Sequence, residues 1–151
     1  MHRVLFAVLP AMLFIFSSCA SGSADGKVPE LASEMCKCFE TMNKEISPAA
    51  AALYKEVAAA PKPGATLRNG LENMEPSEAA AIATAMGQLE DESTEIGKCV
   101  KAFDRKYEKE TTRDRESLFR KLLEEMRKNA SCPIGAALIN LSVEQGIPNG
   151  K

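Results

Sequence analysis

Residues 29–46 read PELASEMCKCFETMNKEI, and the spacing of the apolar residues in this segment predicts the fold class. Its apolar side chains recur at helical spacing and share one face. The members of this face are Leu31, Met35, Cys38, Phe39, Met42 and Ile46. At about 100° per residue, Cys38 lies on one border of the face and Cys36 lies just beyond the other. Two cysteines that flank a core-facing stripe can reach two different neighbouring helices, so we expect a helix that is cross-linked on both sides.

The remainder of the chain predicts an all-α fold, because no segment alternates with period two for long and Ala, Glu, Lys, Leu and Met dominate. Further helices are expected over residues 48–60, 67–74, 77–110, 112–128 and 134–145. In the fourth of these six helices, apolar residues spaced by four and three form a heptad seam from Ile82 to Tyr107. This seam can pack on the chain's own helices or bind a second copy. We predict one compact bundle of four to six helices over residues 28–151.

The N-terminal segment has the pattern of an export signal. His2 and Arg3 precede an apolar run over residues 4–16, and Ser17 and Ser18 follow it before Cys19. The run is shorter than the roughly 20 residues that a membrane-spanning helix needs. We therefore predict that residues 1–18 are a cleaved signal peptide. The alternative is ordinary secretory cleavage after Ala20, which would discard Cys19.

The small residues that end at Cys19 resemble the lipobox of bacterial lipoproteins, although Phe16 stands where that family usually has leucine. The resemblance implies cleavage before Cys19, a diacylglyceryl group on its thiol and an acyl chain such as palmitate on its amine. Several chains together give stable attachment to a membrane. Ala20 stands where the family's inner-membrane retention signal has aspartate, which favours the outer membrane of the cell envelope. Residues 19–27 are expected to form a flexible tether.

Four further cysteines lie in the expected domain, at Cys36, Cys38, Cys99 and Cys132. An even number of cysteines in an exported chain predicts disulfides. A bond between Cys36 and Cys38 is disfavoured, because side chains two residues apart on a helix point away from each other. Two pairings stay open, and both join the first helix to the segments that contain Cys99 and Cys132.

The composition argues for a non-enzymatic protein. The chain has one histidine, His2, which leaves with the signal peptide, and its formal net charge is −2 without a basic patch. The expected domain therefore lacks the commonest general base and metal ligand, and nucleic acid is not an expected partner. We expect an interaction or structural module with no cofactor and no metal. An envelope protein is its expected partner, and the alanine-rich residues 49–60 are the first candidate surface.

A second hypothesis assigns chemistry to Cys36 and Cys38. Together with Met35 and Met42 they offer the soft thiolate and thioether ligands that suit Cu(I). All four domain cysteines could instead hold zinc, or the C-x-C pair could act as a redox dithiol. In an oxidising compartment, disulfides with methionines as core filler are the favoured interpretation.

Overall fold

The computed structural model describes residues 24–108 and 115–146, and these residues are helical without a strand. The all-α prediction is therefore confirmed. The elements in these ranges are the 3-10 turn η1 (Ala24–Lys27) and the helices α1 (Val28–Cys38), α2 (Glu40–Glu45), α3 (Pro48–Ala59), α4 (Pro63–Glu72), α5 (Pro76–Glu90), α6 (Glu95–Lys106), α8 (Arg115–Arg127) and α9 (Pro133–Glu144). No helix in these two ranges is long and apolar enough to cross a membrane. Cys19 and the predicted signal peptide lie outside the described residues.

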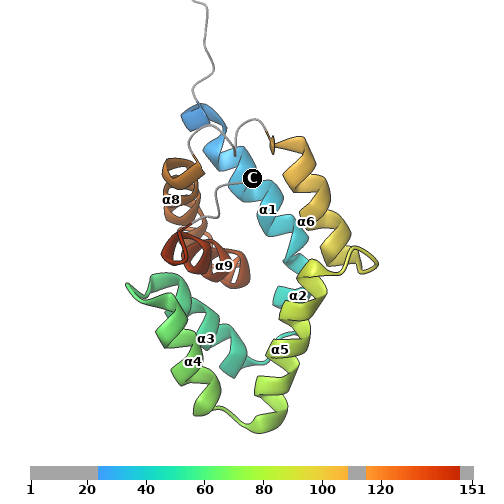
Figure 1. Ribbon diagram of the computed structural model, residues 1–151, viewed down its shortest axis with the longest axis vertical. Helices are drawn as coiled ribbons and strands as arrows, with labels where there is room; N and C mark the ends of the chain where they lie inside the picture. The colour runs from blue at the N-terminus through green and yellow to red at the C-terminus, as the bar shows by residue number, and fades with distance from the viewer. Residues whose placement is uncertain (1–23, 109–114, 147–151) are drawn as a thin grey trace, which may run out of the picture.

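Helix α9 is the centre of the fold. It packs against α3, α4 and α8, while α1 lies between α8 and α6 (Figure 1). A helix that is apolar around its whole circumference is normally buried, and α9 has this character. Its buried residues are Ile134, Gly135, Ala136, Ala137, Ile139 and Asn140. The other helices are arranged around it or around α1.

Close packing at the start of α9 requires glycine at position 135. A Cβ atom on Gly135 would lie 2.5 Å from Cε of Met126 and 2.9 Å from Sγ of Cys132. Such distances are far below van der Waals contact, and both neighbours are almost completely buried. The missing side chain therefore lets α9 approach α8.

The end of α3 is held by polar side chains from two other helices. Nδ2 of Asn140 donates hydrogen bonds of 2.8 Å to the carbonyl oxygens of Val57 and Ala60. Nε of Arg127 donates to the carbonyl oxygen of Ala58 at 2.8 Å. The last carbonyls of a helix lack partners within the helix. Helices α8 and α9 supply those partners and fix the position of α3.

This packing uses much of the alanine-rich segment that the sequence offers as a partner surface. Five of its side chains are buried in the core, namely Ala50, Leu53, Tyr54, Val57 and Ala58. Ala49, Ala52 and Ala59 remain exposed. Most of the apolar surface of residues 49–60 is thus covered within the chain.

The prediction of one continuous helix over residues 77–110 is wrong, because a turn at residues 91–94 separates α5 from α6. The N–H of Ser93 donates to Oδ1 of Asp91 at 2.8 Å, and Oγ1 of Thr94 accepts from the N–H of Gly97 at 3.0 Å. These local bonds compete with helix continuation and cap the new helix. The heptad seam from Ile82 to Tyr107 is therefore divided between two helices.

The stretch over residues 29–46 also forms two helices instead of one. Its break lies at Phe39, whose N–H donates to the carbonyl oxygen of Cys36 three residues back, at 3.1 Å. This tighter turn ends α1, and α2 begins at Glu40. Because two expected helices are each divided, the described residues hold eight α-helices, and the predicted number of four to six is too low.

We expect Asn140→Ala to lower the free energy of unfolding by about 1–3 kcal/mol, because it removes the side-chain hydrogen bonds that α9 donates to the carbonyl oxygens of Val57 and Ala60 at the end of α3. Asn73→Ala is the matched control, since Nδ2 of Asn73 makes a hydrogen bond of the same length, 2.8 Å, to the exposed carbonyl of Asn69. That control should change stability by less than about 0.5 kcal/mol. Denaturant unfolding of both variants checks this, and equal losses would contradict the role given to Asn140.

Candidate functional site

The four domain cysteines form two disulfides, Cys36–Cys132 and Cys38–Cys99, each with Cα atoms 5.5 Å apart. This is one of the two pairings that the sequence leaves open. The first bond joins α1 to the residue before α9, and the second joins α1 to α6. The two sulfurs on α1 thus bond to different helical segments on either side of it. Cys132 is completely buried.

The methionines near these cysteines belong to the core. Met42 is buried, and Met35 is half-buried against the core cluster. No group of three or more His, Cys, Asp or Glu side chains within residues 24–108 and 115–146 is placed to hold a metal ion. In the oxidised state shown here, Cys36 and Cys38 have no thiolate to offer as a ligand or nucleophile.

A hollow of about 470 Å³ lies beside the Cys36–Cys132 bond, and we call it the basic hollow. Its walls come from α1, α2, α3 and the loop before α9. The lining residues are Ser33, Cys36, Lys37, Glu40, Asn43, Lys44, Ala51, Lys55, Asn129, Ala130, Ser131 and Pro133. Three lysines face one carboxylate, and that carboxylate, of Glu40, pairs with Lys44 at 2.6 Å. The net charge of the wall is positive, so it suits an anionic group.

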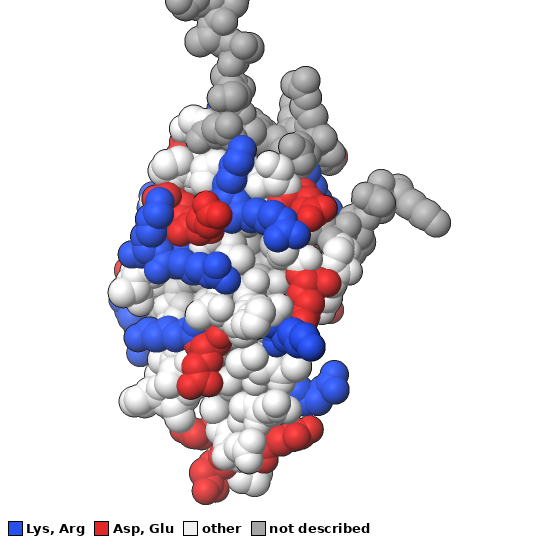
Figure 2. Space-filling view, turned by 90° about the vertical axis from the view of Figure 1, so that its left-hand side faces the viewer, with Lys and Arg blue, Asp and Glu red and all other residues white. Residues whose placement is uncertain are grey.

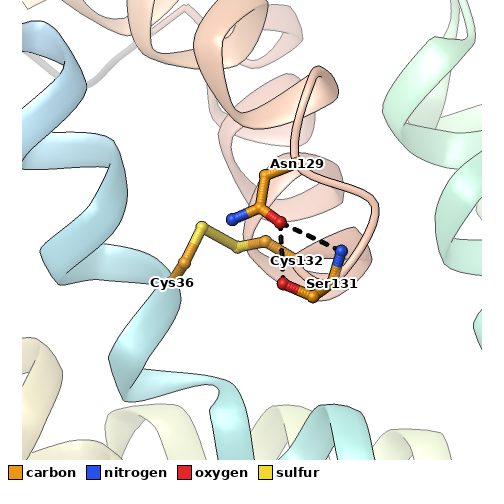
Figure 3. The surroundings of a disulfide bond; sticks show 4 residues. All are labelled: Cys36, Asn129, Ser131 and Cys132. Atoms are coloured by element: carbon orange, nitrogen blue, oxygen red, sulfur yellow. Dashed lines mark hydrogen bonds between the residues drawn. A yellow bond between two sulfur atoms is a disulfide. The ribbon is translucent and has the colours of Figure 1, made fainter.

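Two features shape the polar wall of the basic hollow. Oδ1 of Asn129 accepts hydrogen bonds from the N–H and the Oγ–H of Ser131 at 3.0 and 2.7 Å, which holds the loop beside the disulfide (Figure 3). Asn43 also lines the hollow, and both amide atoms of its side chain are buried without a hydrogen-bond partner in the described chain. Leaving such a group unpaired is costly. The wall of the hollow therefore contains an amide with unused hydrogen-bonding capacity.

The sequence does not predict the basic hollow, because its residues come from four separate segments. The only local signal is the seven-residue spacing of Lys37 and Lys44, which would put them on one side of a single continuous helix. That spacing is common on solvated helices, so it does not by itself indicate a site.

Elsewhere the charged surface is mixed. Figure 2 shows acidic and basic side chains next to each other on the face that carries α8. Arg120 pairs with Glu116 at 2.8 Å and Lys128 with Glu125 at 2.7 Å, and these ion pairs are exposed. Exposed pairs of this kind contribute little to stability. They make this face a solvated one.

Removing either disulfide should destabilise the protein, and removing Cys36–Cys132 should destabilise it more. The bonded residues are 96 and 61 positions apart, for which the chain-entropy model gives similar losses of roughly 4–5 kcal/mol. The Cys36→Ala/Cys132→Ala variant also leaves unfilled space where the buried Sγ of Cys132 packs. Its melting temperature should therefore fall below that of Cys38→Ala/Cys99→Ala. The reverse order would contradict the central position given to Cys132.

Comparison of the chain with protein-family models, with curated proteins and with solved structures found no match. The features of the chain that bear on its function are the two disulfides, the basic hollow beside one of them, and the pattern that ends at Cys19.

Proposed function

We propose that this protein is an exported, lipid-anchored module of the bacterial cell envelope that acts by binding and not by catalysis. The observation that carries the proposal is the pairing of all four domain cysteines in disulfides. Disulfides form and persist in oxidising compartments and are rare in the cytosol. This agrees with the export pattern of residues 1–18 and with the resemblance of the segment before Cys19 to a lipobox.

The anchor would set the orientation of the module. Four residues separate Cys19 from the start of η1 at Ala24, and a chain of that length spans at most about 18 Å. The end of the molecule that carries η1 would then lie near the membrane, most simply the outer membrane. Helix α5 and the loop between α4 and α5 lie at the opposite end (Figure 1), and they would face away from the lipid.

The basic hollow is the proposed contact site, and an acidic segment of an envelope protein is the proposed partner. Lys37, Lys44 and Lys55 give it a positive wall, and the amide of Asn43 offers unused hydrogen-bonding capacity. The Cys36–Cys132 bond fixes two of its walls before any partner arrives. Preformed walls reduce the ordering cost of binding.

The alternative from the sequence, a soft-metal or thiol-redox role for Cys36 and Cys38, requires both disulfides to be reduced first. Each cysteine has a different partner, in α6 or before α9, so reduction would also release the links between α1 and those segments. No observation on the described residues favours this alternative over a structural role for the disulfides.

The anchor is tested by the intact mass of the native protein from its own cell envelope, measured before and after thiol alkylation without reductant. We expect a chain that begins at Cys19, carries acyl chains and takes up no alkylating reagent, because the other four thiols are oxidised. A product that begins after Ala20 would contradict the lipid anchor. Alkylation of Cys36 or Cys38 would instead contradict the disulfide scaffold and support the metal or redox alternative.

The basic hollow is tested with a fluorescein-labelled hexaglutamate peptide, whose binding is followed by fluorescence anisotropy. Lys37→Glu/Lys55→Glu should weaken binding at least tenfold, because it reverses two charges on the wall of the hollow. Lys62→Glu/Lys98→Glu makes the same change in charge outside the hollow and should leave affinity within about twofold. Equal weakening by both pairs would show general charge attraction and refute a site at the hollow.

A further inference from the structure

A second hollow lies next to helices α2 and α3, and its character is the opposite of the first. It has a volume of about 320 Å³ and is formed by α2, α3 and α5. Its apolar walls include Met42, Ile46, Ala50, Ile82 and Ala85. We call it the apolar groove. Its volume is at the lower end of the roughly 300–1,000 Å³ of small-molecule sites, and its lining has their mainly apolar composition.

Tyr54 contributes to the wall of the apolar groove, and its hydroxyl has no hydrogen-bond partner within the described residues. The side chain is 1% exposed. Burial raises the pKa of Tyr54 above its ordinary value of 10.0, so the hydroxyl stays protonated and can donate. A buried tyrosine hydroxyl usually finds a partner. An acceptor atom on a ligand in the groove would supply the hydrogen-bond partner that the Tyr54 hydroxyl lacks.

The rim of the apolar groove is acidic. Glu45 and Glu78 line it together with Gln88, and no lysine or arginine is among the lining residues. Neither carboxylate forms an ion pair within the part of the chain that the structure describes. An apolar body with a positive group at its end would complement this rim, whereas a fatty acid would place a carboxylate against two others.

Helix α5, which forms the outer wall, is held to the molecule chiefly through α6. The α3–α9 packing does not include α5, so a small outward movement of α5 would displace its buried residue Ile82 but leave that packing in place. A ligand needs such a movement to reach the Tyr54 hydroxyl, because that hydroxyl is buried when the groove is empty. Figure 1 shows α5 standing opposite α3 at the end of the molecule away from η1.

We propose that the apolar groove binds a small organic cation: an amine with an apolar body and a hydrogen-bond acceptor at its far end. The ammonium group lies at Glu45 and Glu78, the body lies between Ile46 and Ile82, and the acceptor takes the hydrogen bond of Tyr54. This activity goes beyond the proposed function, because it needs neither the lipid anchor nor the basic hollow.

The test uses the mature protein in lipid nanodiscs and calorimetric titration with three probes, against empty nanodiscs as the blank. 5-Methoxytryptamine has the ammonium, the apolar ring and an acceptor oxygen, 5-methoxyindole-3-acetate replaces the ammonium by a carboxylate, and tryptamine lacks the acceptor. We expect 5-methoxytryptamine to bind at least tenfold more tightly than the acid and severalfold more tightly than tryptamine. Glu45→Gln/Glu78→Gln should remove most of the preference for the amine over the acid. Equal binding of the amine and the acid to the unmodified protein would overturn the proposal.

Tyr54→Phe is the decisive variant, because the proposal predicts a higher melting temperature for the free protein but a lower affinity for the ligand. It should raise the melting temperature of the free protein, since an unpaired buried hydroxyl is removed. It should also weaken 5-methoxytryptamine severalfold and leave tryptamine unchanged. A lower melting temperature with unchanged binding would show that the hydroxyl has a structural role only, and would overturn its assignment to the ligand.

Filling the apolar groove is an independent check on its location. Ala85→Leu places a larger side chain on the wall and should abolish binding of 5-methoxytryptamine. Ala83→Leu is the matched control, because Ala83 is exposed on the same helix and does not line the groove. Binding retained by Ala85→Leu would overturn the location. Light scattering that shows a dimer, dissociated by Ala85→Leu, would assign the groove to a second copy of the chain instead.

Discussion

Two cysteines that are two residues apart on α1 determine how the other helices are held together. Cys36 bonds to Cys132 and Cys38 bonds to Cys99, so α1 is tied covalently to segments on both sides. The Cys132 bond fixes the start of α9, and α9 in turn fixes α3 through Asn140. Only 5% of the residues are aromatic. Because each aromatic side chain in a core buries a large apolar area, a chain with few of them gains stability from such covalent links.

Sequence reasoning found the parts of the fold that follow from local periodicity. The apolar face of residues 29–46 indicated the helical class and placed its cysteines toward two neighbours, as the structure shows. It missed the turn between α5 and α6, although Asp91, Ser93 and Thr94 are residues whose side chains compete for backbone hydrogen bonds. It missed the central place of α9 as well, because its small residues become informative only once Gly135 is packed against Met126.

The sites could not be predicted in the same way, because they are products of packing between distant segments. Asn43 and Asn129 line one hollow but are far apart in the sequence, and no periodicity connects them. The sequence places Tyr54 on a helix face, but only the assembled core shows that its hydroxyl lacks a partner. The pairing of the cysteines is partly predictable from the sequence, since the directions of side chains on a helix exclude one of the three possible connectivities.

The two hollows differ in how their walls are held, and this difference matches the ligands proposed for them. A disulfide joins two walls of the basic hollow, and charged or hydrogen-bonding contacts need donors and acceptors in fixed positions. The outer wall of the apolar groove is α5, which is held by packing against α6. The hydrogen bond proposed for this groove comes from Tyr54 on α3, whereas the contacts of the ligand's body with α5 are apolar, and apolar contacts are non-directional and tolerate small displacements. Helices α2 and α3 contribute to both hollows, with Lys44 in one and the adjacent Glu45 in the other. Neighbouring residues on one short helix thus give the two sites opposite charge, so that a ligand suited to one is disfavoured at the other.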